Sequence, residues 1–210
     1  MRIVLATRNR GKVSELQALL SDLGLEIISM DQAGDLPEII EDGLTFQDNA
    51  TKKAMEVARA TGLMAIADDS GLEVDALGGR PGVFSARYAG ENASDEENYL
   101  KLLQEMEGID SDQRTARFRC VMVACTPEGE CVVSHGTCEG SITTEPRGSQ
   151  GFGYDPVFVP AGDRRTMAEL TRQEKNRISH RGKALEALKK KLEDFIRRFQ
   201  SHGHSKKHQA

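Results

Sequence analysis

IVLATRNRGK, residues 3–12, joins a continuously apolar run to a polar turn. A short run of this kind is typical of a strand that is covered on both faces. Beyond the turn, apolar residues recur with helical spacing from Val13 to Leu23, and Gly24 suits the end of a helix. A strand, a turn and a helix in succession indicate the first unit of an α/β fold.

The same alternation continues along the chain. We expect further strands at residues 25–29, 64–67, 118–126, 131–137 and 156–159, and helices at about residues 47–61, after Ser94, and at 179–199. The turn at residues 127–130 indicates a hairpin. Crossover units beside a hairpin predict an α/β fold with a mixed sheet. No linker divides residues 1–200, so we expect a single domain, followed by a disordered polar tail at residues 201–210.

Composition excludes several classes of protein. The chain has 210 residues and carries a net charge of −5. It is 38% hydrophobic and 29% charged, which is typical of soluble globular proteins. No apolar run approaches the roughly 20 residues that span a bilayer. A signal-peptide core is also missing, and the acidic charge disfavours a stable nucleic-acid partner. We therefore expect a cytoplasmic protein without a membrane partner.

Four cysteines, Cys120, Cys125, Cys131 and Cys138, lie at unequal gaps and form no CxxC pair. We expect buried free thiols, with a disulfide or a zinc site as the less favoured alternatives.

The polar turn is the first candidate site, and it consists of Thr7, Arg8, Asn9, Arg10, Gly11 and Lys12. Backbone N–H groups at a helix N-terminus attract phosphate, and the cationic side chains add positive charge. Ala6 and Val13 replace the glycine and the hydroxyl residue of the GxxxxGK[ST] pattern, which disfavours a P-loop NTPase. The alternative interpretation is a solvated basic turn.

Acidic residues form a second candidate site. Asp68-Asp69-Ser70-Gly71 follows the apolar run 64–67, and we place it at the carboxyl end of that strand, where open α/β sheets bind ligands. Adjacent carboxylates on extended backbone face opposite sides, so one of them can reach a cleft and hold Mg²⁺ or orient water. The alternative is a turn or helix cap. Glu38, Glu41 and Asp42 are a possible second source of carboxylates, and for Lys52 and Lys53 we expect a surface role by default.

Two further segments have the chemistry to bind a base. In the loop 148–155, Phe152 and Tyr154 offer flat faces for stacking, while Pro156 breaks the GxGxxG pattern of a dinucleotide site. Residues 175–181 place cations at the expected start of the last helix, where the helix dipole disfavours them, and this indicates an anionic ligand. Together the segments indicate a nucleotide site with a metal.

Six segments, in order along the chain, match motifs of one known family. They are TRNRGK at residues 7–12, GLTFQDNATKKA at 43–54, ADDSGL at 67–72, PGVFSARY at 81–88, GFGYDP at 151–156 and SHRG at 179–182. This pattern resembles the inosine triphosphate pyrophosphatase family, the dITP/XTP pyrophosphatases. The resemblance covers the chain from Met1 to about Phe199.

The resemblance implies an elongated mixed sheet flanked by helices, with two lobes around a central cleft. It implies hydrolysis of ITP, dITP and XTP to the monophosphate and pyrophosphate with Mg²⁺, by a homodimer that cleanses the nucleotide pool. Asp69 would be the catalytic proton acceptor and, with Glu41, would hold the metal. Thr7, Asn9, Lys12 and Lys53 would contact the triphosphate, with Arg8, Arg10 and Gly11 beside them; Ser70, Phe152, Gly153, Tyr154, Asp155, Lys175, His180 and Arg181 would surround the base and sugar.

Hydrogen-bond polarity suggests how such a site selects its base. Hypoxanthine and xanthine present a 6-oxo acceptor where adenine presents a 6-amino donor, so donors such as Lys175 and Arg181 favour the first two. Two other functional classes stay open at this point. A nucleotide-binding regulator would use the same contacts without turnover. A nucleic-acid-associated protein would use the basic residues of the last helix, which are more simply its solvated face.

Overall fold

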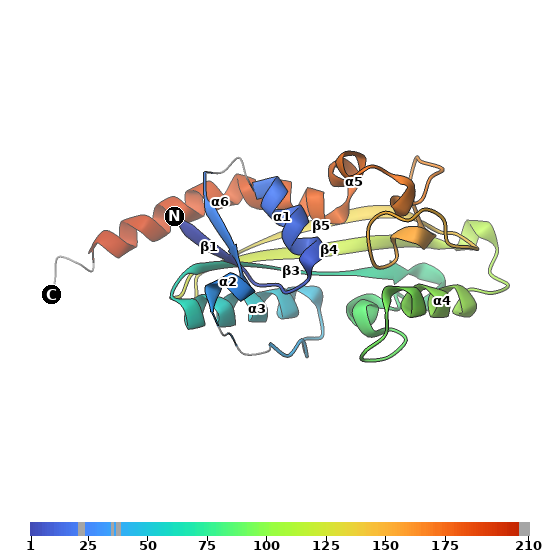
Figure 1. Ribbon diagram of the computed structural model, residues 1–210, viewed down its shortest axis with the longest axis horizontal. Helices are drawn as coiled ribbons and strands as arrows, with labels where there is room; N and C mark the ends of the chain where they lie inside the picture. The colour runs from blue at the N-terminus through green and yellow to red at the C-terminus, as the bar shows by residue number, and fades with distance from the viewer. Residues whose placement is uncertain (21–23, 35, 37–38, 206–210) are drawn as a thin grey trace.

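A six-stranded mixed sheet organises the protein (Figure 1). The computed structural model describes residues 1–20, 24–34, 36 and 39–205. The strands are β1 (Arg2–Leu5), β2 (Glu26–Ser29), β3 (Met64–Val74), β4 (Thr115–Cys125), β5 (Cys131–Ile142) and β6 (Phe158–Pro160), in the order β2-β1-β3-β4-β5-β6. β1 pairs in parallel with β2 and β3, and all later pairs are antiparallel. The expected mixed α/β sheet is confirmed.

Helices cover both faces of the sheet. They are α1 (Arg10–Leu20), α2 (Met30–Ala33), α3 (Phe46–Thr61), α4 (Asp95–Glu105), α5 (Arg172–Ile178) and α6 (His180–Ser205), and short 3₁₀ turns lie at Asp75–Leu77, Gly82–Arg87, Ser111–Gln113, Asp155–Val157 and Met167–Glu169. α1 and α6 pack on one face and α3 on the other.

The apolar run of β1 is buried on both sides. Ile3 and Leu5 belong to the core under α1 and α6, whereas Val4 belongs to the core under α3. All three side chains are 0% exposed. Burial on both faces is the reason why this strand reads as an uninterrupted apolar run.

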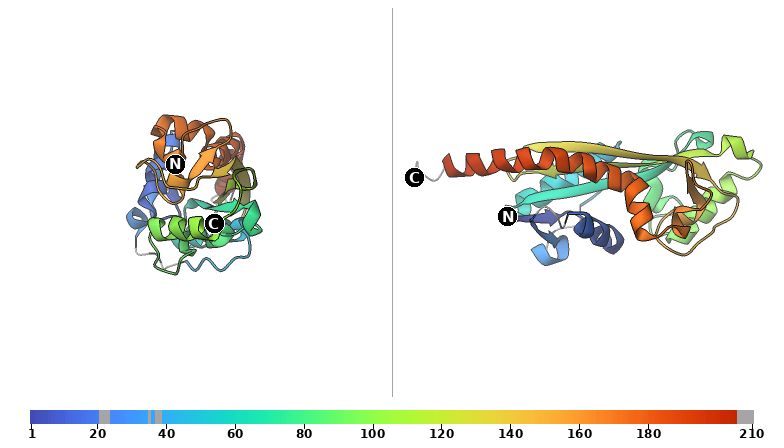
Figure 2. Two further views of the ribbon diagram at one scale, coloured as in Figure 1. Left: turned by 90° about the vertical axis from the view of Figure 1, so that its right-hand side faces the viewer. Right: turned by 90° about the horizontal axis from the view of Figure 1, so that it is seen from above.

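A separate core lies at the other end of the long strands β3, β4 and β5. Leu72, Leu102, Phe118 and Phe158 pack there, in a cluster that includes α4 and β6. Figure 2 shows α4 and α6 toward opposite ends of the elongated molecule. The structure thus has two lobes that share one sheet, as expected.

The acidic segment lies inside β3, and our prediction that it follows the strand was wrong. β4 pairs with β3 from Ala65 to Val74, so the backbone stays extended through the carboxylates. On its other side β3 pairs with β1, which ends at Leu5 opposite Ile66. The residues after Ala67 therefore lie along an edge of β3 that β1 leaves open.

The prediction for the cysteines was wrong for one pair. Cys125 and Cys131 face each other across the β4–β5 hairpin and form a disulfide. Cys120 and Cys138 are buried free thiols, as predicted.

Two other predictions, the polar tail and the acidic cluster that includes Glu38, concern residues that the structure describes only in part. The expected tail at 201–210 overlaps α6, which extends to Ser205, and residues 206–210 lie outside the described residues, as does Glu38. Within the described chain, no helix combines the length and the apolar character needed to cross a membrane.

Candidate active site

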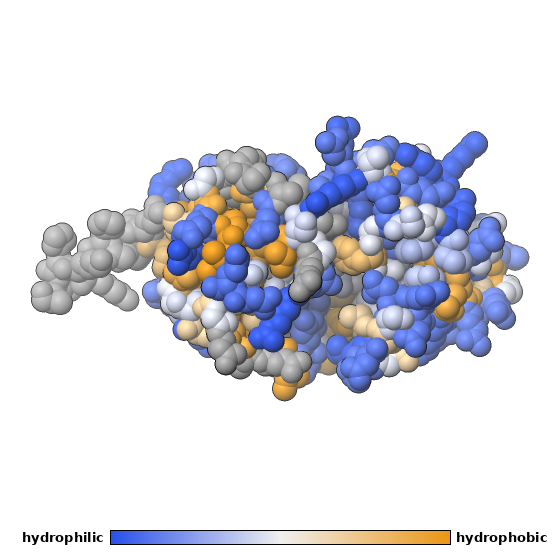
Figure 3. All heavy atoms as spheres, in the orientation of Figure 1, coloured by the Kyte–Doolittle hydropathy of each residue, from blue (hydrophilic) through white to orange (hydrophobic). Residues whose placement is uncertain are grey.

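A cavity of about 410 Å³ opens beside β3, where β1 ends. Figure 3 shows the molecule hollowed between the two lobes. Fifteen of the predicted site residues line the cavity: Thr7, Arg8, Asn9, Lys12, Glu41, Lys53, Asp69, Ser70, Phe152, Gly153, Tyr154, Asp155, Lys175, His180 and Arg181. Gly11 does not line it but lies against the Phe152 ring, which would be 3.1 Å from a Cβ at that position. Arg10 is the first residue of α1.

The adjacent carboxylates of β3 have different partners, as extended backbone predicts. Asp68 is 0% exposed, and its Oδ2 accepts from Lys12 Nζ at 3.0 Å and from Arg181 Nε at 3.4 Å. Burial raises the pKa of Asp68, but the charges of Lys12 and Arg181 outweigh it and bring the pKa well below its ordinary value. Asp68 therefore stays ionised and holds two cations at the cavity.

Asp69 has a less cationic environment. Its Oδ2 accepts from Asn49 Nδ2 at 3.0 Å, its Oδ1 accepts from the Ser70 N–H at 3.0 Å, and Lys53 Nζ lies 3.9 Å from Oδ1. Burial raises the pKa of Asp69 above its ordinary value, against the charge of Lys53. A carboxylate with a raised pKa is a better proton acceptor than an exposed one.

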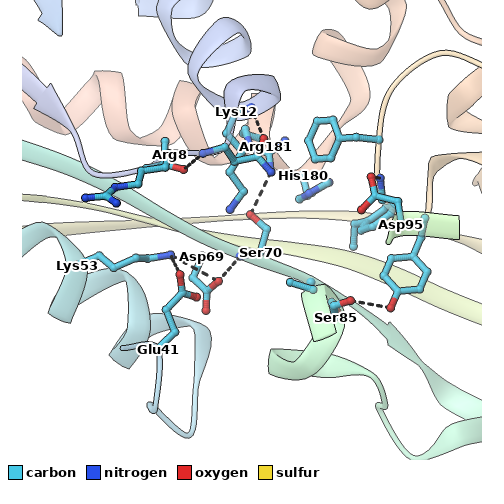
Figure 4. Close-up of a pocket in the computed structure, with 18 of the residues that line it drawn as sticks. Arg8, Lys12, Glu41, Lys53, Asp69, Ser70, Ser85, Asp95, His180 and Arg181 are labelled. Atoms are coloured by element: carbon cyan, nitrogen blue, oxygen red, sulfur yellow. Dashed lines mark hydrogen bonds and ion pairs between the residues drawn. The ribbon is translucent and has the colours of Figure 1, made fainter. Parts of the chain in front are cut away.

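Lys53 joins the two carboxylates that face the cavity. The side chain is buried in α3, and its Nζ lies 3.0 Å from Glu41 Oε1 (Figure 4). Burial lowers the pKa of Lys53, but Asp69 and Glu41 raise it by more. The lysine is therefore held as a cation within the pocket, and our default expectation of a surface role was wrong.

The donor set fits a hard cation such as Mg²⁺. Glu41 and Asp69 both direct carboxylate oxygens toward Lys53 at one end of the cavity (Figure 4). Among the residues that the structure describes, no cluster of three or more His, Cys, Asp or Glu side chains forms a closed metal cage. Mg²⁺ commonly takes one or two protein carboxylates and completes its shell with water and substrate phosphates. Two carboxylates at an open cavity suit that arrangement.

The β1–α1 turn is held by its own side chains. Asn9 Oδ1 accepts from the Lys12 N–H at 3.1 Å, and Thr7 Oγ1 accepts from the Asn9 N–H at 3.2 Å. Arg8 donates to the Leu36 carbonyl at 2.7 Å. The start of α1 and the Lys12 cation therefore lie at the cavity in a fixed arrangement, which is suited to an anion.

Phe152 and two cations form the other end of the cavity. Lys175 Nζ lies 4.6 Å and Arg181 Cζ 5.4 Å from the centre of the Phe152 ring. Asp155 Oδ2 accepts from the Phe152 N–H at 2.9 Å and from Lys175 Nζ at 2.7 Å. An aromatic face beside oriented donors can bind a flat heterocycle that carries acceptor groups.

The wall beside Phe152 contains residues that the sequence analysis did not single out. The Tyr154 hydroxyl donates to the Ser85 carbonyl at 2.8 Å, and its ring packs in the core of the second lobe. The Gly153 N–H donates to Asp95 Oδ2 at 2.7 Å. Ser94 caps α4 through a capping box, and this signal does place Asp95 at the start of a helix, but no local pattern indicates its contact with Gly153.

His180 and Lys175 lie on different helices. α5 ends at Ile178, so Lys175 is in its last turn, where the helix dipole favours a cation. We had predicted that Lys175 lies at the start of a helix, where the dipole disfavours a cation; because Lys175 lies at a helix end, this unfavourable interaction is absent.

His180 begins α6 and stacks on Phe118 with ring centres 4.7 Å apart. Burial brings the pKa of His180 well below its ordinary value, and the charges of Arg181 and Lys175 lower it further. The imidazole is therefore neutral.

Comparisons with known proteins agree in fold and in sequence. The model of the Ham1 family matches residues 3–191. The chain is 52% identical over 191 residues to a dITP/XTP pyrophosphatase of Geobacter sulfurreducens, covering 91% of this chain and 96% of the relative. It is 52% identical over 190 residues to the dITP/XTP pyrophosphatase of Bacillus subtilis, covering 90% and 96%.

Solved structures give the same result. The structure of a HAM1 protein from Coxiella burnetii superposes with a TM-score of 0.85 at 47% identity, covering 92% of this chain and 99% of that one. A nucleoside-triphosphatase, or dITP/XTP pyrophosphatase, from Mycobacterium abscessus superposes with a TM-score of 0.74 at 47% identity, covering 90% and 98%.

Proposed function

Because this chain belongs to the Ham1 family, we propose that it hydrolyses dITP, XTP and ITP to the nucleoside monophosphate and pyrophosphate. The observation that carries the proposal is the division of one cavity into two chemically different ends. Glu41, Lys53 and Asp69 converge at one end, and Phe152 lies with cationic donors at the other. A purine nucleoside triphosphate has the same division between polyphosphate and base.

Cations and backbone dipoles hold the triphosphate. A triphosphate carries about four negative charges, which Lys12, Lys53 and the start of α1 partly balance. Lys12 keeps its ion pair with Asp68 at 3.0 Å, which orients the ammonium group at the cavity. Thr7 and Asn9 place the polar side of the turn toward the same phosphates.

Asp69 accepts the proton of the water that attacks the α-phosphorus. Its raised pKa brings its basicity closer to that needed near neutral pH. Glu41 and Asp69 would hold Mg²⁺, which supplies a Lewis acid for the phosphate oxygens when it is bound. Lys53, between the two carboxylates, offsets their mutual repulsion and the negative charge that develops on the leaving pyrophosphate.

The other end of the cavity selects the base. The Phe152 ring provides a stacking face, and Lys175 and Arg181 provide donors that suit the 6-oxo group of hypoxanthine or xanthine. Ser70, Gly153, Tyr154, Asp155 and His180 enclose the base and sugar. Adenine presents a 6-amino donor, which these donors leave unpaired, so it is rejected.

The active form is a homodimer that removes non-standard purine nucleotides from the pool. Leu44 and Phe84 are 90% and 56% exposed, and they supply apolar surface that a second copy would cover. Light scattering would then give twice the mass of the chain.

Pyrophosphate release from a panel of nucleotides tests this function. With Mg²⁺ present, we expect dITP, XTP and ITP to be hydrolysed with kcat/KM at least about 10²-fold higher than dATP or ATP, because a site built for an acceptor rejects a donor. Tight binding of dITP without pyrophosphate release would instead identify a nucleotide-binding regulator, and the proposed activity would be wrong.

A further inference from the structure

A buried amide lies behind the two carboxylates of the site. Asn49 is 1% exposed and lies near the start of α3. Its Nδ2 donates to Asp69 Oδ2 at 3.0 Å, and its Oδ1 accepts from the Gly43 N–H at 2.7 Å. One side chain therefore contacts both the strand that carries Asp69 and the loop that carries Glu41.

We propose that Asn49 is a positioning residue that fixes Asp69 and Glu41 relative to each other for metal binding and catalysis. The inference rests on the proposed function. Asn49 does not belong to the described wall of the cavity, so it acts through the two carboxylates and not by contact with substrate.

The hydrogen bonds determine which way the amide points. A backbone N–H can bond only to the amide oxygen, so the contact with Gly43 fixes that oxygen and leaves the NH₂ group toward Asp69. Asp69 Oδ2 is thereby occupied, and its Oδ1 lies toward Lys53. A carboxylate in place of the amide would face Asp69 with like charge.

Gly43 lets the loop approach Asn49, and the helix that carries Asn49 begins with a separate cap. Thr45 caps α3, since its Oγ1 accepts from the Asp48 N–H at 3.1 Å while Asp48 Oδ2 accepts from the Thr45 N–H at 3.2 Å. This capping box stabilises the first turn of α3, and the Asn49 amide is bonded to other partners, Gly43 and Asp69. A Cβ at residue 43 would lie 2.6 Å from Asn49 Oδ1, so the close approach of the loop to the amide requires Gly43.

The variant Asn49→Asp separates the two contacts of the amide. It keeps an acceptor for the Gly43 N–H and loses the donor to Asp69. We expect kcat for dITP to fall by about 10²-fold, the upper range for a residue that orients a metal ligand. Because Asn49 touches no substrate, KM for dITP should stay within about threefold of wild type.

A second readout does not depend on turnover. Mn²⁺ alone, followed by electron paramagnetic resonance, reports cation binding to the free protein. We expect Asn49→Ala to weaken Mn²⁺ binding by about tenfold, because the carboxylates lose their common support. Gly43→Ala disturbs the same amide from the loop side and should lower kcat in the same way.

Asp48→Ala is the matched control. It lies in the same turn and breaks the capping box, so the melting temperature falls while the contacts of Asn49 remain. We expect its kcat and its Mn²⁺ affinity to stay near the wild-type values. Gln47→Ala, on the exposed side of that turn, should change neither stability nor kcat.

The outcomes separate this inference from the proposed function. A wild-type kcat in Asn49→Asp, or a loss of kcat in Asp48→Ala as large as in Asn49→Asp, would overturn the positioning role. Unchanged Mn²⁺ affinity in Asn49→Ala would do so as well. If the wild-type protein hydrolyses no dITP, the proposed function fails, and the Mn²⁺ measurements still decide whether Asn49 positions the carboxylates.

Discussion

At the scale of single residues, the neighbouring carboxylates Asp68 and Asp69 have different partners and different pKa values because they face different sides of β3. Asp68 is paired with Lys12 and Arg181 and stays ionised, whereas Asp69 has the raised pKa of a partly desolvated base. The extended backbone is sufficient to predict that the two side chains point to opposite faces of the sheet. Their different pKa values depend on cations from α1, α3 and α6, which no local pattern in the sequence brings together.

Replacing Asp69 tests its role as proton acceptor. We expect Asp69→Asn to keep the fold and to lower kcat for dITP by at least about 10²-fold, because the amide neither accepts the proton nor carries charge toward a cation. Steady-state kinetics with the melting temperature as control measure this. Near wild-type turnover in a folded Asp69→Asn protein would remove Asp69 from the mechanism.

The neutral imidazole of His180 predicts how stability depends on pH. Its pKa is depressed in the folded state, so the unfolded chain takes up a proton below about pH 6.5 that the folded chain does not. Stability is therefore lost as the pH falls. Between pH 7.5 and 5.5, we expect the wild type to lose about 1.4 kcal/mol more unfolding free energy than His180→Gln.

Urea unfolding of both proteins at the two pH values gives this difference directly. Equal losses of unfolding free energy in the wild type and in His180→Gln would show that burial does not lower the pKa of His180 in the folded protein.

At the scale of elements, a strand was predicted at each of β1 to β6 and a helix at α1, α3, α4 and α6, whereas the short helices α2 and α5 were not predicted. β1, the first helix and the β4–β5 hairpin have apolar patterns of full length. α2 spans Met30–Ala33 and α5 spans Arg172–Ile178, which is too short for a helical pattern to be distinct. β3 was predicted too short because its polar residues look like a strand end, whereas pairing with β4 continues through them to Val74.

In the candidate site, too, local sequence patterns predict some residues and miss others. The predicted site residues were expected to meet, and fifteen of the seventeen do line one cavity. Asp95 and Ser85 were missed because their contacts join positions 58 and 69 residues away along the chain. Only the tertiary packing of the chain brings such pairs together.

Close packing of β5 against α6 gives a prediction at this scale. A Cβ on Gly136 would overlap the carbonyl oxygen of His180 and the backbone nitrogen of Ala184, so the helix start can approach the strand only at a glycine. We expect Gly136→Ala to cost about 1–3 kcal/mol of stability and to raise KM for dITP, since His180 and Arg181 move with α6. His135→Ala, at the exposed neighbouring position, is the control. An unchanged melting temperature and KM in Gly136→Ala would contradict this packing.

At the scale of the whole molecule, the sheet joins two lobes that contribute different chemistry. The α1 and α3 side supplies Lys12, Lys53 and Glu41, and the other side supplies Phe152 and Asp95. A Cβ at residue 11 would lie 3.1 Å from the Phe152 ring, so the start of α1 lies next to that ring at the cavity. A substrate that spans phosphate and base therefore binds both lobes at once.

Removal of the metal tests the phosphate end of the cavity. We expect EDTA to abolish pyrophosphate release and Mg²⁺ to restore it, because Lys12 and Lys53 only partly balance the charge of a triphosphate and supply no Lewis acid for its oxygens. The chelated protein should keep its melting temperature. Persistent turnover in chelator would refute the metal assignment for Glu41 and Asp69.

Hydrolysis of dITP in H₂¹⁸O tests the central claim most directly, because it reports which phosphorus atom the water attacks at the Asp69 end of the cavity. Mass spectrometry of the products should find one ¹⁸O atom in dIMP and none in the released pyrophosphate. Label in pyrophosphate, or formation of dIDP and inorganic phosphate, would contradict attack at the α-phosphorus and with it the proposed arrangement of substrate in the site.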